Sequence, residues 1–339
     1  MPMIRRAAIG TTVLLFVLLL GACTSHSKAS SPTTVPRATA PSSVPGTAPS
    51  PSPSTALSPP PVPSSGAYLG AWVNPDHMRA STGDVAQVEM SQLSTVSPTL
   101  GRPLGILHAY ASWSAPAPIS ALTAISSSGA VPLLDWGCHS TAQINSGQED
   151  STITAYANAL KSYGKPIFLR WFWEMNLTNI QKNRACLGSA GPAGFVKAWH
   201  HIHNLFQQVG AKNVAFVWCP GNSNLNRIAA FYPGNATVDW IGIDGYAARG
   251  QNFATLFGRF YERYVGHGKP MMVAETGALG ADQPAYLSSI LASAPSDFPQ
   301  IKAFVYFDAP GPRGNWSLTT SGLAEYAQLG RNPYFSARA

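Results

Sequence analysis

Carboxylates are scarce in this sequence, and several of them stand at the ends of apolar runs. Only 15 of the 339 residues are Asp or Glu. A buried strand rarely ends in an acid unless that acid is paired or does chemistry, because an unpaired buried charge is costly. Five acids close such runs and are the first candidates for a reactive site: Asp135, Glu174, Asp244, Glu275 and Asp308.

Glu174 and Glu275 are the only glutamates in this group. Two carboxyl groups that flank a cleft are what glycoside hydrolysis requires, since one protonates the leaving oxygen and the other attacks the sugar or activates water. A separation of about 5–5.5 Å between the carboxyl groups predicts retention of configuration. The alternative is structural, with either glutamate only forming an ion pair to Arg170 or Arg249.

The acids follow short runs rich in β-branched and aromatic residues, which alternate with helical segments. Runs that are apolar throughout are typical of parallel strands buried on both faces. Two intervening segments, 193–209 and 253–265, carry apolar residues at spacings of three and four, as amphipathic helices do. The expected strands are 68–74, 104–112, 131–137, 166–175, 213–221, 238–246, 269–277 and 302–309.

Eight such alternations within residues 67–339 predict an α/β fold, a single (β/α)₈ TIM barrel. Active sites of this fold lie at the C-terminal ends of the strands. The fourth and seventh strands lie on roughly opposite sides of the barrel mouth, so Glu174 and Glu275 can converge on one bond. A doubly wound open sheet is the alternative, but no Gly-rich fingerprint follows the first strand.

The N-terminal residues predict export. Arg5 and Arg6 precede a 14-residue apolar stretch that is too short to span a bilayer comfortably, which indicates a signal peptide over residues 1–22. The small residues that follow end on Cys23, in a pattern that resembles the bacterial lipobox and implies lipidation of Cys23. A plain secretory signal with an incidental cysteine is the alternative.

Residues 23–66 are expected to form a lipidated, disordered tether. The stretch 24–66 contains 11 prolines among mostly Ser, Thr and Ala, and such a segment cannot bury enough apolar surface to fold. We therefore expect the protein to be anchored to the outer face of the cell membrane through Cys23, or secreted if Cys23 is unmodified.

The net charge of +7 is unevenly distributed. The first 66 residues hold four of the 22 basic residues and no acid, so residues 67–339 carry a net charge of only +3. Phosphate recognition needs clustered Lys and Arg, and no such run is present. Nucleic acid is therefore excluded as a partner, and we expect a monomer that needs no cofactor.

Four segments resemble glycoside hydrolase family 26, whose members are retaining (β/α)₈ glycosidases, often β-mannanases. The resemblance is clear over about 165–280 and looser over 68–165 and 300–339. It is carried by 166–176 (PIFLRWFWEMN), 195–221 (FVKAWHHIHNLFQQVGAKNVAFVWCPG), 231–246 (FYPGNATVDWIGIDGY) and 269–277 (KPMMVAETG).

The resemblance implies an endo-acting hydrolase of a β-linked polysaccharide or oligosaccharide that works by double displacement. In that family the acid/base and nucleophile stand on strands four and seven, which correspond to Glu174 and Glu275. Carried over in the same way, Tyr246 hydrogen-bonds to the nucleophile and Arg170 orders the floor of the site.

The sequence departs from the family at two positions. The family usually has His before its acid/base and often Gly after the following Asn, whereas this chain has Trp173 and Leu177. The residue before the acid/base contacts the sugar that becomes covalently bound, so mannan, glucan, xylan and arabinose-containing wall polymers all stay open. The alternative function is a carbohydrate-binding or wall-organising lipoprotein with little turnover.

Aromatic residues near the strand ends are candidates for sugar binding, because pyranose rings stack on flat π-surfaces. The preferred platforms are Trp136, Trp173, Trp218 and Trp316, with Trp72 and the strand-end His108 as further candidate substrate contacts.

Two other groups of residues have simpler interpretations. His200, His201 and His203 lie within a helix and without a carboxylate motif of the HExxH type, so we predict a packing or solvated face and no metal site. Cys138 and Cys186 follow the third and fourth strands, and an exported protein can keep a disulfide between these adjacent loops. Cys219 would then be a buried free thiol, with Cys186–Cys219 as the competing pair.

Overall fold

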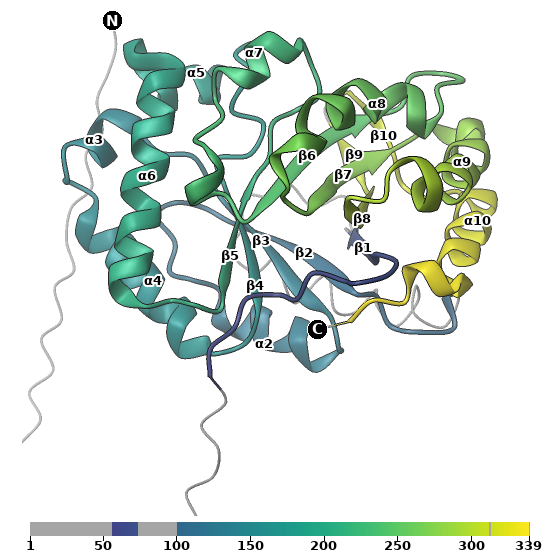
Figure 1. The fold of residues 1–339 in the computed structure, drawn as a ribbon, viewed down its shortest axis with the longest axis horizontal. Coiled ribbons are helices and arrows are strands. Elements are labelled where there is room, and N and C mark those ends of the chain that lie inside the picture. Colours follow the sequence, from purple (N-terminus) through teal and green to yellow (C-terminus); the bar gives the residue numbers. More distant parts are fainter. Residues whose placement is uncertain (1–55, 74–99, 312, 339) are drawn as a thin grey trace, which may run out of the picture. The chain divides into compact units, whose positions relative to one another are not determined.

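The structure is a computed structural model that describes residues 56–73, 100–311 and 313–338. Within these residues, eight parallel strands close into a barrel in chain order, and the last strand pairs back with the first. Helices surround the strands on the outside (Figure 1). The predicted (β/α)₈ barrel is thus confirmed.

The expected strands coincide with the observed ones to within a few residues. The barrel consists of β1 (Tyr68–Val73), β2 (Ile106–Ala111), β3 (Val131–Trp136), β4 (Ile167–Trp171), β5 (Val214–Trp218), β6 (Trp240–Tyr246), β7 (Met271–Gly277) and β8 (Ile301–Asp308). A two-stranded hairpin of β9 (Pro310–Gly311) and β10 (Gly314–Asn315) follows.

The α-helices of the described residues are α2 (Ile119–Ser127), α3 (Thr141–Asn145), α4 (Asp150–Tyr163), α5 (Gln181–Leu187), α6 (Gly191–Val209), α7 (Leu225–Ala229), α8 (Phe253–Tyr264), α9 (Gln283–Asp297) and α10 (Thr320–Arg331). Short 3₁₀ turns are η1 (Gly188–Ala190), η2 (Asn235–Thr237), η3 (Val265–His267), η4 (Gly280–Asp282) and η5 (Pro333–Phe335).

Local sequence sets the ends of the two helices predicted by periodicity. Helix α6 starts with Pro192 in its first turn and ends at Gly210, whose φ of 77° is the left-handed cap that glycine adopts without strain. Helix α8 starts after Asn252, whose side chain accepts a hydrogen bond from the Thr255 N–H.

Each strand alternates between the barrel interior and the layer of helices. On β3, Val131 and Leu133 belong to the inner apolar cluster, whereas Leu134 and Trp136 belong to the larger cluster between strands and helices. This period of two decides which residues can face the mouth of the barrel.

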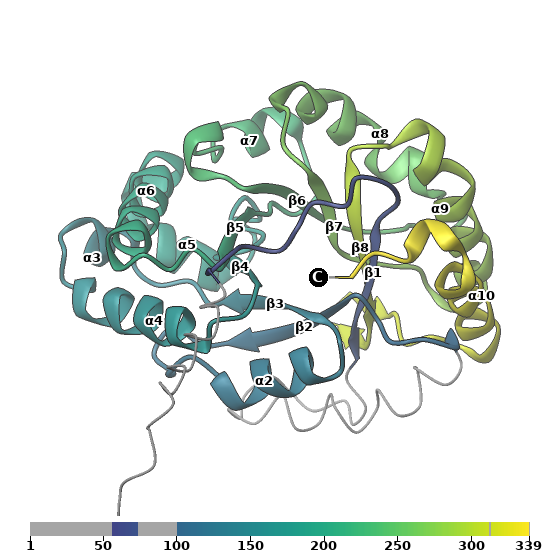
Figure 2. The ribbon, with the colours of Figure 1, turned by 60° about the horizontal axis from the view of Figure 1, so that its bottom comes forward.

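The N-terminal end of the barrel is covered by two chain segments. Pro60 is buried, the Pro61 carbonyl accepts a hydrogen bond from the Tyr68 hydroxyl at 2.9 Å, and Ala67 N–H donates to the Tyr334 carbonyl. Figure 2 looks at this end, with the purple segment and the C-terminus in front of the strands. The chain therefore contacts the barrel from Pro60 onward, ahead of the predicted boundary at residue 67.

The predicted signal peptide and Cys23 lie outside the described residues. Among the described helices, none combines the length and the apolar character needed to cross a bilayer.

Candidate active site

Strand register gathers the polar residues of the barrel interior into one layer. Tyr110 on β2 pairs with Asp135 on β3, which in turn pairs with Arg170 on β4. On the other side of the barrel, Asp244 on β6 pairs with Glu275 on β7. These residues lie toward the C-terminal ends of their strands, which is where the fold places its chemistry.

Arg170 is the centre of this layer and is fully buried. Its Nε donates to Asp135 Oδ1 at 2.6 Å, and its Nη1 donates to both oxygens of Asp244 at 2.6 and 2.7 Å. Its Nη2 contacts Asp135 and Glu275. A buried guanidinium needs carboxylate partners in this fork geometry, and here three acids supply them.

A β-bulge turns Glu275 into the barrel. Ile243 pairs with Val273, but the next pair on β6 and β7 joins Asp244 to Glu275, so one residue of β7 is extra. Ala274 belongs to the inner cluster, and Glu275 also contacts the interior Arg170. Bulges commonly re-aim side chains beside active sites, and strict alternation would have pointed this glutamate at the helices.

Three donors hold the Glu275 carboxylate. Tyr110 donates its hydroxyl to Oε1 at 2.8 Å, Arg170 also contacts Oε1, and Tyr246 donates to Oε2 at 2.7 Å. Burial alone would raise the pKa of Glu275, but Arg170, His108 and the Tyr246 hydroxyl outweigh it and lower the pKa below its ordinary value. Glu275 is therefore a carboxylate at neutral pH.

Glu174 lies three residues beyond the end of β4, in a turn with unusual backbone geometry. Its φ is 53° and that of Phe172 is 48°, which are left-handed values that cost a non-glycine residue about 1–3 kcal/mol. Glu174 N–H donates to the Cys219 carbonyl at the end of β5, and Phe172 N–H donates to the Trp136 carbonyl at the end of β3. The turn is thus fixed between the two neighbouring strand ends.

Asn176 fastens the same turn to the loop after β5. Its Nδ2 donates to the Gly221 carbonyl at 2.7 Å and its Oδ1 accepts from the Gly221 N–H at 2.8 Å. A side chain at position 221 would have its Cβ 3.2 Å from Glu174 Oε1 and 2.7 Å from Leu177. A larger residue at position 221 would therefore force the Leu177 and Glu174 side chains to shift.

The Glu174 carboxyl has the opposite electrostatic setting to Glu275. Burial, followed by the negative charge of Glu275, raises the pKa of Glu174 to about 7. The Glu275 charge therefore acts on the Glu174 carboxyl across the mouth of the barrel. Glu174 also lines a cavity of about 150 Å³, together with Phe172, Trp173, Ile180, Lys182, Asn183 and Cys138.

Trp173 separates this cavity from the charged layer. The residue is partly exposed, and its ring lies 5.6 Å from the Arg170 guanidinium carbon in a cation–π contact. Its other neighbour is the Tyr110 ring, at 5.4 Å between centroids. Trp173 therefore offers a flat surface beside Arg170 and Tyr110, which both contact Glu275.

Two carboxyl groups with opposite pKa shifts at the mouth of a (β/α)₈ barrel point to glycoside hydrolysis. A sequence profile of glycosyl hydrolase family 26 matches residues 132–309, a span that contains both glutamates. The chain belongs to glycosyl hydrolase family 26. The matched profile is that of a family of glycosyl hydrolases.

Relatives of this family 26 protein differ in what their names say they cleave. Endoglucanase H of Acetivibrio thermocellus is 25% identical over 296 residues, which cover 78% of this chain and 30% of that protein. β-1,3-Xylanase TXYA of a Vibrio species is 22% identical over 139 residues, covering 39% of this chain and 28% of that protein. The chain thus spans less than a third of these two relatives.

A solved structure supports the fold. The catalytic domain of the endo-β-1,4-mannanase of Bacillus sp. JAMB-750 superimposes with a TM-score of 0.59 at 13% identity, covering 80% of this chain and 87% of that one. At 13% sequence identity, this similarity supports the barrel fold of the chain but does not indicate its substrate.

The predictions for Trp136 and Trp218 are wrong. Both are fully buried outside the barrel interior, in the layer between strands and helices. Trp136 stacks on Tyr156 of α4 with 4.1 Å between ring centroids, and Trp218 packs against Tyr232 and Tyr264. Side chains alternate in direction along a strand. Each of these tryptophans follows an inward-facing residue, so it points outward to the helices.

Trp72, Trp316 and His108 lie inside the site's walls and offer no open surface. Trp72 packs edge-on against Tyr110, and Trp316 lies 4.3 Å from the Tyr246 ring between centroids. His108 is buried, with its Nε2 2.8 Å from Asp135 Oδ2. These three residues therefore support Tyr110, Tyr246 and Asp135 from behind, and the predicted direct contacts with sugar do not fit their burial.

One potential metal-ligating group occurs among the described residues, namely His108, Asp135 and Glu275. All three contact the same nitrogen of Arg170, so a guanidinium already occupies the point where they converge. A metal cation at that point would also be repelled by the guanidinium charge.

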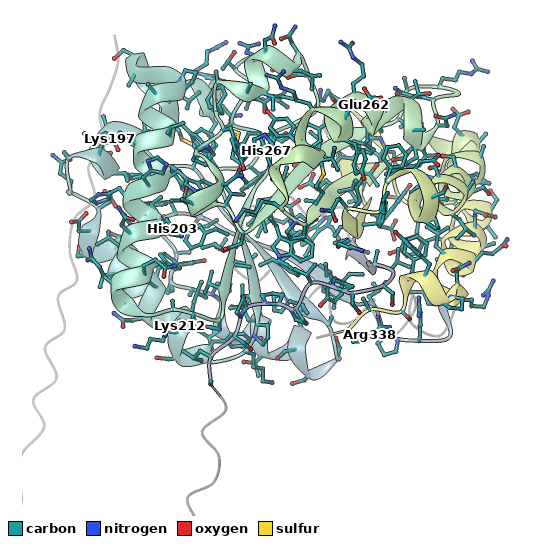
Figure 3. All side chains as sticks on the ribbon, in the orientation of Figure 1. Lys197, His203, Lys212, Glu262, His267 and Arg338 are labelled. Carbon is teal, nitrogen blue, oxygen red and sulfur yellow. A yellow bond between two sulfur atoms is a disulfide. The ribbon has the colours of Figure 1, made fainter. Side chains whose placement is uncertain are left out.

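The histidines of α6 have local partners. His200 contacts the Pro233 carbonyl, His201 lies 2.6 Å from Asp150, and His203 packs on Phe216. Figure 3 marks His203 on this helix. The packing face predicted for the three histidines agrees with these contacts.

The remaining predicted residues fall into structural positions. Cys138 and Cys186 form a disulfide, and Cys219 is a buried free thiol 3.2 Å from Asp244 Oδ1. Asp308 accepts the Leu318 N–H at 2.7 Å and so orders the loop after β8. Asp244 pairs with Arg170 in the polar layer.

Sequence reasoning missed Tyr110, Asn176 and Asn183. Tyr110 could have been found, because it lies two residues after His108 on β2 and therefore shares its inward face. The two asparagines hold backbone groups of a turn, and no sequence pattern announces such contacts.

Proposed function

We propose that this chain is a retaining, endo-acting β-glycan hydrolase in which Glu275 is the nucleophile and Glu174 is the acid/base. The observation that carries the proposal is the opposite pKa shift of two carboxyl groups that interact electrostatically at the C-terminal end of the barrel. Near neutral pH one is ionised and the other can hold a proton, which are the two states that double displacement needs.

In the first step, Glu275 attacks the anomeric carbon and Glu174 transfers its proton to the departing glycosidic oxygen. Tyr246 and Tyr110 stay protonated because burial and the Glu275 charge raise the pKa of both hydroxyls well above the ordinary value. They therefore remain hydrogen-bond donors that orient the carboxylate and leave one lone pair of Oε2 free to attack.

In the second step, Glu174 takes a proton from water, which then attacks the glycosyl-enzyme. Glu174 is left as a carboxylate by the first step, and it stays one because the Glu275 charge, the main charge that raises the pKa of Glu174, is absent while the ester exists. The cavity beside Glu174 is suited to the leaving-group side of the glycan, since the acid must face the departing oxygen.

The substrate class follows from the relatives only in outline. Their names include a glucanase, a β-1,3-xylanase and β-1,4-mannanases. The substrate is identified by incubating the enzyme with mannans, mixed-linkage glucans, xylans and native wall polysaccharides and measuring which of them releases reducing ends. We further propose that the enzyme is monomeric and exported, with a lipid on Cys23 that holds it at the outer face of the cell membrane.

Two variants test the roles of the glutamates. Glu275→Ala is expected to lower kcat by at least about 10⁴-fold on every substrate. Glu174→Ala is expected to lose about 10²–10⁴-fold on a glycan but much less on an aryl glycoside with a good leaving group, and added azide should restore part of its turnover. Glu262→Gln, on the exposed surface of α8, is the matched control. Undiminished turnover in either alanine variant refutes the assignment.

A further inference from the structure

A short helix beside the site is attached to the backbone of Glu174. Asn183 on α5 donates through Nδ2 to the Glu174 carbonyl at 2.8 Å and to the Leu177 carbonyl at 3.3 Å. The side chain is 7% exposed and borders the cavity that Glu174 also lines. One amide group therefore bridges both ends of the turn that presents the carboxyl.

The turn needs this support because of its conformation. Glu174 has a φ of 53°, which a residue with a side chain adopts only where its surroundings impose it. Its N–H is held by Cys219, but its carbonyl is held by Leu177 N–H and Asn183. Without the amide, Leu177 N–H is the one remaining donor to that carbonyl among the described residues, and the carboxyl can turn away from the scissile bond.

Helix α5 is too short to place Asn183 by itself. It has seven residues, and no side chain caps its N-terminus. Isolated helices of this length are unstable. The disulfide between Cys186 on α5 and Cys138 in the loop after β3 supplies a covalent attachment, three residues from Asn183. The Thr141 hydroxyl also donates to the Leu187 carbonyl at the end of the helix.

We propose that Asn183, held in place by the Cys138–Cys186 disulfide, is a positioning residue for the acid/base Glu174. It touches no reacting atom and acts only through the backbone of Glu174. The inference rests on the proposed function. The disulfide holds α5 against the loop after β3, and α5 in turn positions Asn183. Asn183 then holds the backbone of the proton donor Glu174.

The test compares two substrates that differ in their need for acid catalysis. An oligosaccharide of the glycan that the enzyme cleaves requires a proton at its leaving oxygen, whereas the dinitrophenyl glycoside of the same sugar does not. For Asn183→Ala, kcat/KM should fall about 10- to 100-fold on the oligosaccharide and less than about threefold on the dinitrophenyl glycoside. Glu174→Ala should show the same contrast more strongly, and the double variant Cys138→Ser/Cys186→Ser more weakly.

Asn213→Ala is the matched control. This buried asparagine also donates to two backbone carbonyls, those of Leu160 and Lys165, but it precedes β5 at the opposite end of the barrel. Its variant should lower the melting temperature without any contrast between the substrates. If Asn183→Ala does not fold, Asn183→Asp keeps the side-chain volume while losing the donor, and it is measured instead.

The outcomes separate the inference from the proposed function. An equal loss on both substrates, or no loss, in folded Asn183 variants overturns the positioning assignment while Glu174→Ala still shows the contrast. Absence of the contrast in Glu174→Ala overturns the proposed function instead.

Discussion

At the residue scale, two identical side chains acquire different chemistry from their neighbours. Glu275 has a guanidinium and two hydroxyl donors around it, whereas Glu174 is partly desolvated and feels a negative charge. The ion pair to Arg170 that the structural alternative expected is present at Glu275. Ion pairing and nucleophilic attack are compatible here, because the pair keeps the carboxylate ionised.

The pH dependence of kcat/KM follows from the two shifts. Activity requires ionised Glu275 and protonated Glu174. It should rise with pH through the pKa of Glu275, which lies below the ordinary 4.5, and fall as pH increases through about 7, where Glu174 loses its proton. The profile is measured as initial rates from pH 3 to 9. A plateau that extends unchanged to pH 9 would contradict the assignment of Glu174 as the acid.

At the element scale, the sequence predicts the strands well but the direction of their side chains only in part. Asp135 had to face inward to be satisfied by Arg170, and alternation then places its neighbour Trp136 among the helices. The same alternation could have assigned Trp218. It could not have assigned Glu275, because the bulge on β7 has no sequence signature and reverses the expected direction. The left-handed turn at Glu174 is equally invisible, since nothing in the residue type favours it.

A pair of tryptophan variants separates packing from binding. Trp136→Ala removes a ring stacked on Tyr156 and should lower the free energy of unfolding by about 3–5 kcal/mol, with kcat/KM of the folded enzyme nearly unchanged. Trp173→Ala removes a partly exposed ring over Arg170 and should lower kcat/KM roughly tenfold with little loss of stability. Denaturant unfolding and steady-state kinetics measure both effects. A reversal of the two patterns would show that the interior and exterior faces are wrongly assigned.

At the scale of the whole molecule, the two ends of the barrel serve different purposes. The N-terminal end is covered by residues 56–66 and the C-terminal segment, where Phe335 is fully buried. The chemistry lies at the other end. This separation is usual for the fold and lets the loops of the mouth vary without loss of the core.

Residues 1–55, which the structure does not describe, contain the proposed signal peptide and lipidation site of the enzyme. Cys23→Ser should move the protein from the membrane fraction to the culture medium or block its processing, and should abolish incorporation of labelled fatty acid. Ser25→Ala, in the same segment, is the control and should stay with the membrane. Unchanged membrane association of the Cys23 variant would show that the lipid anchor is wrongly assigned.

The central claim is that Glu275 forms a covalent bond to the sugar, and trapping tests it most directly. A 2-deoxy-2-fluoro glycoside of the cleaved sugar with a good leaving group should inactivate the enzyme, because the fluorine slows hydrolysis of the glycosyl-enzyme. Mass spectrometry of the digested protein should then find one added glycosyl group, on the peptide that contains Glu275. A label on any other residue, or hydrolysis with inversion and no label, would contradict the account.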